Sequence, residues 1–153
     1  MSEVFDNIIN ILEENNIGYE HLKHDHVHSS IDAAKIRGIE SPKEGVKSLI
    51  FKTKEKNFIL VLVPGDKRAD SKRIKRFEKT KDMKLASPEE VEKLAGVTVG
   101  SVGPFGLKTD FKTYFDKDIL INEFSYFSPG THLDTIKLKP RDLLKILKDP
   151  ILF

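Results

Sequence analysis

The run Phe58–Pro64, with the sequence Phe-Ile-Leu-Val-Leu-Val-Pro, constrains the fold of this chain more than any other stretch. It is apolar at consecutive positions, which is typical of a strand covered on both faces in the middle of a sheet. Val46–Thr53 precedes it as a second expected strand, and Lys54–Asn57 between them is a good hairpin signal. We therefore predict a hairpin whose second strand is central.

Helical spacing and capping residues predict the other elements. Ser2 can cap a first helix with apolar positions Val4, Phe5, Ile8, Ile9 and Leu12, and we expect Gly18 to end it in the left-handed conformation. We further expect an extended segment at 19–27 and strands at 84–86, 113–115, 118–125 and 133–138. A helix is expected at 31–37, closed by Gly38, and a basic helix at 71–77 with Ile74 and Phe77 facing inward. Another helix runs from the capping box Ser87–Glu90 to Leu94 and Gly96, and a closing helix starts at Pro140.

Composition limits the class of protein. The 153 residues form one mixed α/β domain, residues 1–153, with no internal repeat or linker. The absence of cysteine excludes disulfides, thiolate metal sites and thiol catalysis. No apolar run approaches the roughly 20 residues of a membrane span, and residues 1–20 are acidic and amphipathic rather than signal-like. We expect a cytoplasmic location and no membrane contact.

Basic residues are concentrated in one segment of a chain whose net charge is only +2. Eight Lys and Arg fall within residues 67–81, against four acids in 66–82. A local basic surface of this kind indicates contact with a polyanion, although a solvated helix face gives the same pattern. The residues are Lys67, Arg68, Lys72, Arg73, Lys75, Arg76, Lys79 and Lys81.

Three glycines lie within seven positions in Val97–Gly106, namely Gly100, Gly103 and Gly106, together with Pro104 and Phe105. Glycine lets a ligand or a second backbone approach closely and lets several N–H groups point into one concavity. A strand end followed by a tight turn is the alternative. The spacing matches neither a phosphate-binding loop nor a dinucleotide fingerprint.

Two polar features have competing interpretations. Histidines recur at every second position, at His24, His26 and His28, so they would share one face of a strand and could hold a metal ion. An exposed polar strand face produces the same sequence pattern, and we expect no metal. His28 is the one we expect to face a pocket. Lys47, among apolar neighbours on the first hairpin strand, is either an edge lysine reaching solvent or a fixed cation at a pocket mouth.

Several motifs in order resemble the YbaK/prolyl-tRNA-editing (ProX-like) family of aminoacyl-tRNA deacylases. They are Lys47-Ser-Leu49, Gly65-Asp-Lys-Arg68, the basic helix, Gly100 to Gly106 as Gly-x-x-x-Pro-Phe-Gly, Gly130-Thr-His132 and Asp142-Leu143. The likeness extends from about His28 to Leu147. It implies a strongly curved, almost barrel-like mixed β-sheet with helices packed outside.

The resemblance also implies a site. Lys47 corresponds to the family's essential lysine, which holds the terminal nucleotide, and Gly100, Gly103 and Pro104 belong to the loop that shapes the amino-acid pocket. Phe105 is expected as pocket wall or core. His28 and Ser30 match a His-x-Ser/Thr pattern, and His132 falls where several members have a polar residue near the substrate. Asp66, Gly106 and Gly130 complete the expected substrate-binding set, and Lys67, Arg68, Lys72, Arg73, Lys75 and Arg76 are expected to contact tRNA phosphates.

The implied activity is hydrolysis of the ester in mischarged tRNA, most commonly a tRNA for proline carrying Ala or Cys. The glycine loop would stabilise the oxyanion, and a free ribose hydroxyl of the substrate would help to place water. No metal or organic cofactor is expected, and an aminoacyl-tRNA synthetase is a further possible partner. The alternatives are a non-catalytic RNA or aminoacyl-tRNA binding module and a synthetase-associated regulatory protein.

Overall fold

The computed structural model describes residues 3–25, 30–38 and 42–153, without the side chains of residues 30 and 31. Its elements, with η marking a 3₁₀ helix, are α1 (Glu3–Glu14), β1 (Tyr19–Lys23), α2 (Ser30–Arg37), η1 (Pro42–Glu44), β2 (Val46–Thr53), β3 (Phe58–Pro64), α3 (Ser71–Glu78), β4 (Met83–Leu85), α4 (Pro88–Ala95), β5 (Lys112–Phe115), η2 (Lys117–Ile121), β6 (Ser125–Phe127), β7 (Asp134–Leu138), α5 (Pro140–Ile146) and β8 (Ile151–Leu152).

The predicted hairpin is confirmed and forms the middle of a five-stranded sheet with the order β4-β2-β3-β5-β8. β2 and β3 are antiparallel from Val46 opposite Pro64 to Lys52 opposite Phe58, and β3 and β5 are parallel. Ile59 to Val63 of β3 are at most 2% exposed. The continuous apolar run is therefore central because both its edges are paired and both its faces are covered.

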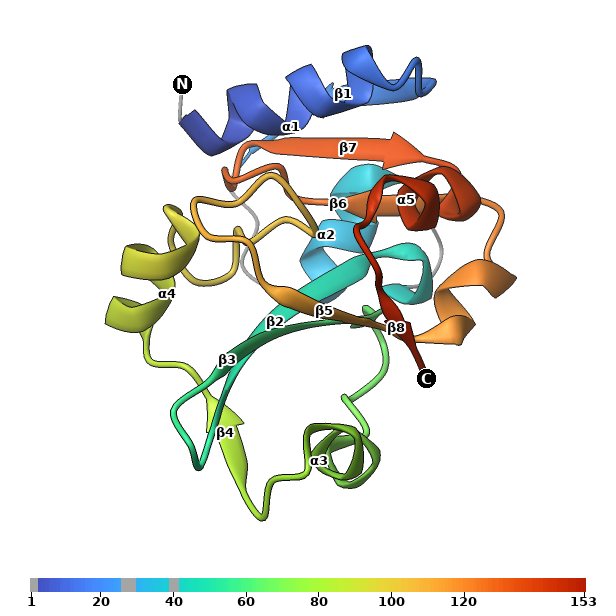
Figure 1. Cartoon of the computed structure of the whole chain (residues 1–153). Coiled ribbons are helices and arrows are strands. Elements are labelled where there is room, and N and C mark those ends of the chain that lie inside the picture. Colours follow the sequence, from blue (N-terminus) through green and yellow to red (C-terminus); the bar gives the residue numbers. More distant parts are fainter. Residues whose placement is uncertain (1–2, 26–29, 39–41) are drawn as a thin grey trace.

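A second, antiparallel sheet of three strands has the order β1-β7-β6. Helix α1 lies along it at the top of Figure 1, and an isolated bridge between Gly45 and Tyr126 links the two sheets. Within residues 3–25, 30–38 and 42–153 the strands form these two sheets and no closed barrel. The mixed α/β class is confirmed.

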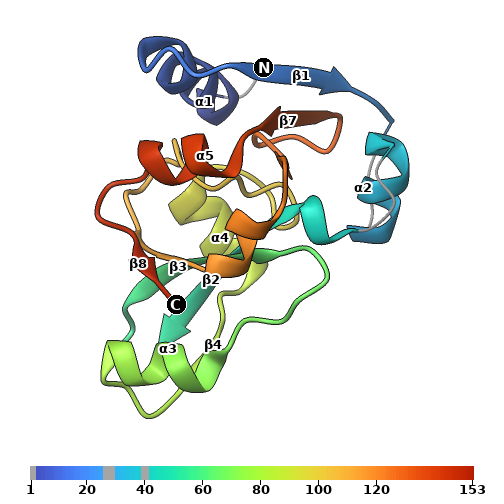
Figure 2. The ribbon, with the colours of Figure 1, turned by 90° about the vertical axis from the view of Figure 1, so that its right-hand side faces the viewer.

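The core has two parts because alternate residues of β3 point to opposite faces of its sheet. The larger part contains Leu60 and Leu62 and is completed by Ile8 and Leu12 of α1. The smaller part contains Ile59, Val61 and Val63 with Ile74 of α3. Figure 2 shows α3 at the bottom of the molecule, below the five-stranded sheet, and α1 at the top. None of the helices in the described residues is long and apolar enough to cross a membrane.

The capping signals around α4 are confirmed. The Ser87 hydroxyl accepts from the Glu90 N–H at 3.1 Å, and the Glu90 carboxylate accepts from the Ser87 N–H at 2.9 Å. Gly96 ends the helix with φ of +80°. These reciprocal bonds satisfy two N–H groups that a helix start otherwise leaves without partners. The chain therefore enters the glycine-rich stretch directly from a fixed helix end.

Two predictions about helix boundaries and faces are wrong. Helix α1 ends at Glu14, and Asn16 with φ of +54° takes the left-handed position that we expected at Gly18. Asparagine tolerates this conformation, so the helix ends earlier than the glycine. On α3, Phe77 is 45% exposed, and its ring meets that of Tyr114 in a T-shaped arrangement. Ile74 is buried as expected.

The strand predicted at 118–125 is also wrong. Residues 117–121 form η2, because the Asp116 carboxylate accepts the Asp118 N–H at 2.9 Å and the Ile119 N–H reaches the Asp116 carbonyl at 3.1 Å. Strand β6 begins only at Ser125. The expected last strand is followed by β8, whose two residues pair in parallel with β5, and so short a strand leaves no periodicity in the sequence.

Candidate active site

A cavity of about 590 Å³ opens beside the start of β2, ahead of the residues Phe51–Thr53 that pair with β4. Helix α2, the end of β3, β4, α4 and the first part of the glycine stretch surround it. Its lining is apolar apart from a few groups, and its charged side chains are Arg37 and Lys47. The lining residues are Ala33, Ala34, Arg37, Pro42, Gly45, Val46, Lys47, Ser48, Leu49, Ile50, Gly65, Leu85, Ala86, Val91, Val99, Gly100, Val102, Ser128 and His132.

Lys47 lies in this cavity, opposite Val63 in the β2–β3 register. Burial lowers the pKa of Lys47, Asp66 opposes this effect, and Arg68 adds to it. Asp66 and Arg68 are exposed in the turn after β3. Within the described residues Lys47 forms no ion pair. The structure therefore holds a cation in a partly desolvated position, as the second of the two interpretations of Lys47 requires.

Gly100 and His132 meet across the cavity from distant parts of the chain. A β-carbon at Gly100 would lie 3.3 Å from His132 Cε1, and Gly100 has φ of +90°. The Ser101 hydroxyl donates to the Thr98 carbonyl at 2.8 Å, so the Thr98 hydroxyl must donate to Ser101 Oγ at 3.2 Å. His132 Nε2 is then the donor in its 3.3 Å contact with Thr98 Oγ1. This nitrogen carries a proton.

The rest of the glycine stretch is turned toward α1. A β-carbon at Gly103 would lie 2.8 Å from the Ser128 carbonyl oxygen, and one at Gly106 would lie 2.9 Å from Ile8 Cγ1. Pro104, Phe105 and Gly106 line a second cavity of about 450 Å³ instead of the first. Phe105 is 9% exposed and its ring meets Phe127 edge-on, which places it in the core. Close backbone packing thus accounts for Gly103 and Gly106.

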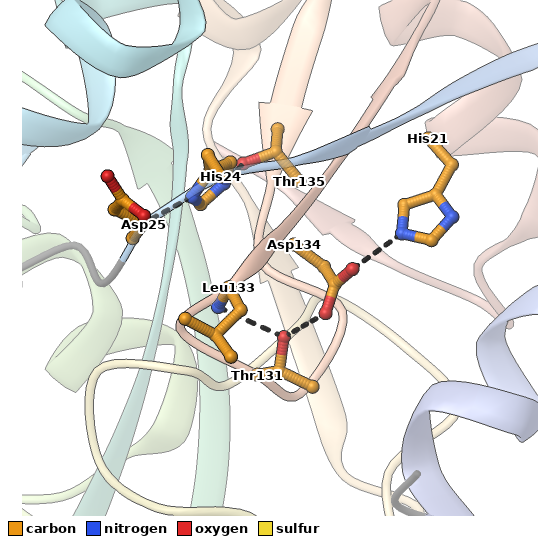
Figure 3. A network of polar contacts seen from close by, with 7 residues as sticks. All are labelled: His21, His24, Asp25, Thr131, Leu133, Asp134 and Thr135. Carbon is orange, nitrogen blue, oxygen red and sulfur yellow. Dashed lines mark hydrogen bonds and ion pairs between the residues drawn. The ribbon is translucent and has the colours of Figure 1, made fainter.

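A residue that sequence reasoning missed is Arg37, at the end of α2. Its Nε donates to Thr135 Oγ1 at 3.0 Å, and Thr135 is fully buried in β7. Thr135 also contacts His24 Nε2 at 2.7 Å (Figure 3). Burial lowers the pKa of Arg37 to about 10, with Tyr126 acting in the opposite direction. No local pattern distinguishes this arginine from a solvated helix residue.

A neighbouring network fixes the turn that carries His132. Asp134 accepts from Thr131 Oγ1 and contacts His21 Nε2 at 2.6 Å, as Figure 3 shows. Burial would raise the pKa of Asp134, but these partners outweigh it and hold the pKa below its usual range. Gly130 stands at the start of the turn with φ of +98° and does not line the cavity. It precedes His132 by two residues in the same turn.

Of the three histidines predicted to share a strand face, His24 lies within the described residues. His26 and His28 lie outside the described residues, as does the side chain of Ser30. His24 follows the end of β1 and bonds to Asp25 and Thr135. Among the residues that the structure describes, no group of three or more His, Asp or Glu could hold a metal ion.

The basic segment divides into two kinds of residue. Lys67 Nζ lies 2.8 Å from Asp116 Oδ2 and 2.9 Å from Asp118 Oδ2, and both carboxylates raise the pKa of this lysine. By contrast, Arg68 and most of the α3 cations are exposed, and in the part of the chain that the structure describes they form no ion pair. These are Arg68, Lys72, Arg73, Lys75 and Arg76, of which Lys75 is half-buried.

Comparison with known proteins identifies the family of this chain. The family model of the aminoacyl-tRNA editing domain matches residues 24–146. The match covers both flanks of the cavity and most of the two sheets. The chain belongs to the aminoacyl-tRNA editing domain family.

Individual relatives support the assignment. The chain is 35% identical over 123 residues to a proline–tRNA ligase of Caldicellulosiruptor bescii, covering 74% of this chain and 21% of the ligase. It is 31% identical over 116 residues to that of Caldicellulosiruptor saccharolyticus, covering 71% and 20%. The chain thus spans about a fifth of these relatives. The crystal structure of a candidate trans-editing enzyme for prolyl-tRNA synthetase superposes with a TM-score of 0.86 at 26% identity, covering 100% of this chain and 96% of that one.

Proposed function

We propose that this protein is an aminoacyl-tRNA deacylase that hydrolyses the ester of mischarged tRNA in trans. The observation that carries the proposal is the shared cavity of Lys47, Gly100 and His132 in a chain of the editing-domain family. The ester is an activated bond, so a positioned water and a stabilised oxyanion suffice for its hydrolysis. The products are the free amino acid and a tRNA with an intact terminal ribose.

The residues of the cavity favour catalysis by binding and orientation. Its charged groups among the described residues are cations, so we assign no carboxylate as general base. Backbone N–H groups beside Gly100 would stabilise the oxyanion, which is commonly worth about 3 kcal/mol per well-placed donor. A free ribose hydroxyl of the substrate would place the water, and Lys47 would hold the terminal nucleotide.

We assign tRNA contact to the exposed cations of α3 and to Arg68, and leave Lys67 out because Asp116 and Asp118 already neutralise it. Substrates would be tRNAs for proline, in keeping with the proline–tRNA ligases among the relatives, and the family resemblance adds Ala or Cys as the attached amino acid. A prolyl-tRNA synthetase is the corresponding partner. The remaining residues of the glycine stretch would support the loop on its α1 side, away from the cavity; they are Gly103, Pro104, Phe105 and Gly106.

The test is incubation of the purified protein with Ala-, Cys- and Ser-charged tRNA for proline while loss of the ester is followed. We expect rapid release from at least one of them and loss of that activity in Lys47→Ala. Lys84→Ala, an exposed lysine of β4, is the matched control and should keep full activity. Salt-dependent tRNA binding without hydrolysis of any ester would refute the proposal and leave a non-catalytic binding module.

A further inference from the structure

The candidate cavity contains a half-buried positive charge, that of Arg37, which the proposed mechanism does not use. Among the described residues, Arg37 and Lys47 are the charged ones that line it, and no described carboxylate lines it. Within the described residues Arg37 has no carboxylate partner; its bond is to the neutral Thr135 hydroxyl. Burial lowers the pKa of Arg37 only to about 10, so the guanidinium is charged at neutral pH. An unpaired charge in a partly desolvated site is costly unless an anion joins it.

The guanidinium is held in one orientation by a chain of hydrogen bonds. The Asp25 carbonyl can only accept, so His24 Nδ1 carries the proton in their 2.8 Å contact. In the neutral ring His24 Nε2 then accepts from the Thr135 hydroxyl at 2.7 Å. The other side of Thr135 Oγ1 accepts from Arg37 Nε. Within the described residues no hydrogen bond engages the terminal nitrogens of Arg37, so these nitrogens can bind a ligand.

These nitrogens lie against the entrance to β2. A β-carbon on Gly45 would be 3.1 Å from Arg37 Nη1, and Gly45 precedes Lys47 by two residues. Two residues of extended chain span about 7 Å. The two cations therefore stand at neighbouring positions on one wall. A fork of N–H donors such as a guanidinium suits a carboxylate or a phosphate.

Resting on the proposed function, we infer that Arg37 binds the 5′-phosphate of the terminal nucleotide of the substrate. The carboxyl group of the amino acid is esterified and its amino group is cationic, so phosphates are the anions that the substrate brings. The phosphate nearest the ester is that of the terminal nucleotide. Repulsion between Arg37 and the α-amino group then directs the amino acid toward the apolar wall of Ala86, Val91 and Val102.

The test combines an enzyme variant with a substrate that lacks the charge. An aminoacylated RNA minihelix is prepared with a natural terminal phosphodiester or with a neutral methylphosphonate at that one linkage. On the natural substrate we expect Arg37→Gln to raise KM about 10- to 100-fold with little change in kcat. The methylphosphonate should raise KM of the wild type by a similar factor, and Arg37→Gln should add nothing further to it.

Arg141→Gln, at an exposed arginine of α5, is the matched control and should leave both KM values unchanged. Equal losses for Arg37→Gln on both substrates, or no loss on either, would overturn the inference. Thr135→Val tests the positioning of Arg37: its increase in KM should disappear on the methylphosphonate substrate, whereas a general loss of structure would affect both substrates alike.

Failure of the proposed function gives a different result from failure of this inference. If the wild type hydrolyses neither substrate, the deacylase proposal fails. The same comparison of wild type and Arg37→Gln is then made with the dissociation constants of the two minihelices that carry no amino acid. Arg37 should still discriminate the natural linkage from the neutral one, and equal weakening of both by Arg37→Gln would reject the phosphate site.

Discussion

The imidazole of His132 lies against Gly100, so that a β-carbon at Gly100 would come within 3.3 Å of His132 Cε1. The two residues are brought together by the turn after β6, whose position depends on Asp134, Thr131 and His21. Gly100 also has φ of +90°, which side chains other than glycine rarely adopt. This contact sets the shape of the cavity at the glycine loop.

Gly100→Ala should therefore impair both stability and activity. The left-handed backbone costs roughly 1–2 kcal/mol for a residue with a β-carbon, and the methyl group would press on His132. We expect at least a tenfold loss of ester hydrolysis and a lower unfolding midpoint, measured by deacylation and thermal denaturation. Gly18→Ala is the control, because a β-carbon at Gly18 would have none of the described atoms of other residues within 4 Å and Gly18 does not have a positive φ. An equal effect of both changes would contradict this account.

Lys67 should act on stability more than on tRNA binding. It faces Asp116, which is 2% exposed, while Lys67 itself is partly exposed. Lys67→Ala leaves this carboxylate without its cation, and we expect a loss of about 1–3 kcal/mol in the free energy of unfolding. Urea denaturation measures this loss, and the exposed neighbour Lys117→Ala should lose less than about 0.5 kcal/mol. Weaker tRNA binding with unchanged stability would reverse the assignment.

The charge of Glu90 should stabilise the protein in a pH-dependent way. Bonds from Lys52 and from the Ser87 backbone lower the pKa of Glu90 to about 2. A carboxyl group with a depressed pKa contributes stability that is present above its unfolded pKa and lost as pH falls through the folded one. The advantage of the wild type over Glu90→Gln in urea denaturation should thus decline from about pH 4.5 to pH 2. Glu89→Gln, in the same helical turn without Lys52, should show a smaller decline.

The exposed cations of α3 should govern the salt dependence of tRNA binding. Lys72→Gln, Arg73→Gln and Arg76→Gln together remove three charges that form no ion pair in the described residues. Each lost phosphate contact reduces the slope of log K against log salt by roughly 0.7–0.9, so a total of about 2 to 3 is expected. The turn variant Lys54→Gln/Lys56→Gln serves for comparison. A slope unchanged in the α3 variant would show that this face is merely solvated.

The two candidate site segments differ in how far the sequence could place them. Lys47 stands on a strand whose position follows from local periodicity and a short turn, so the strand could be predicted, but the residue pattern left open whether the side chain reaches solvent or a pocket. The glycine stretch could not be divided by sequence alone. Gly100 faces His132 and the cavity, whereas Gly103 and Gly106 accommodate Ser128 and Ile8. All three glycines look alike in the sequence because the backbone that approaches them comes from elsewhere.

The sequence by itself determined the central hairpin, the capping box of α4, the mixed α/β class and the family resemblance. Each depends on hydrophobic periodicity, turn chemistry or motif order within short stretches. Only the tertiary structure decided that Arg37 meets Thr135, 98 residues away, and that Asp116 turns residues 117–121 into η2. Such contacts are set by how the two sheets and α2 pack together, and no local pattern records them.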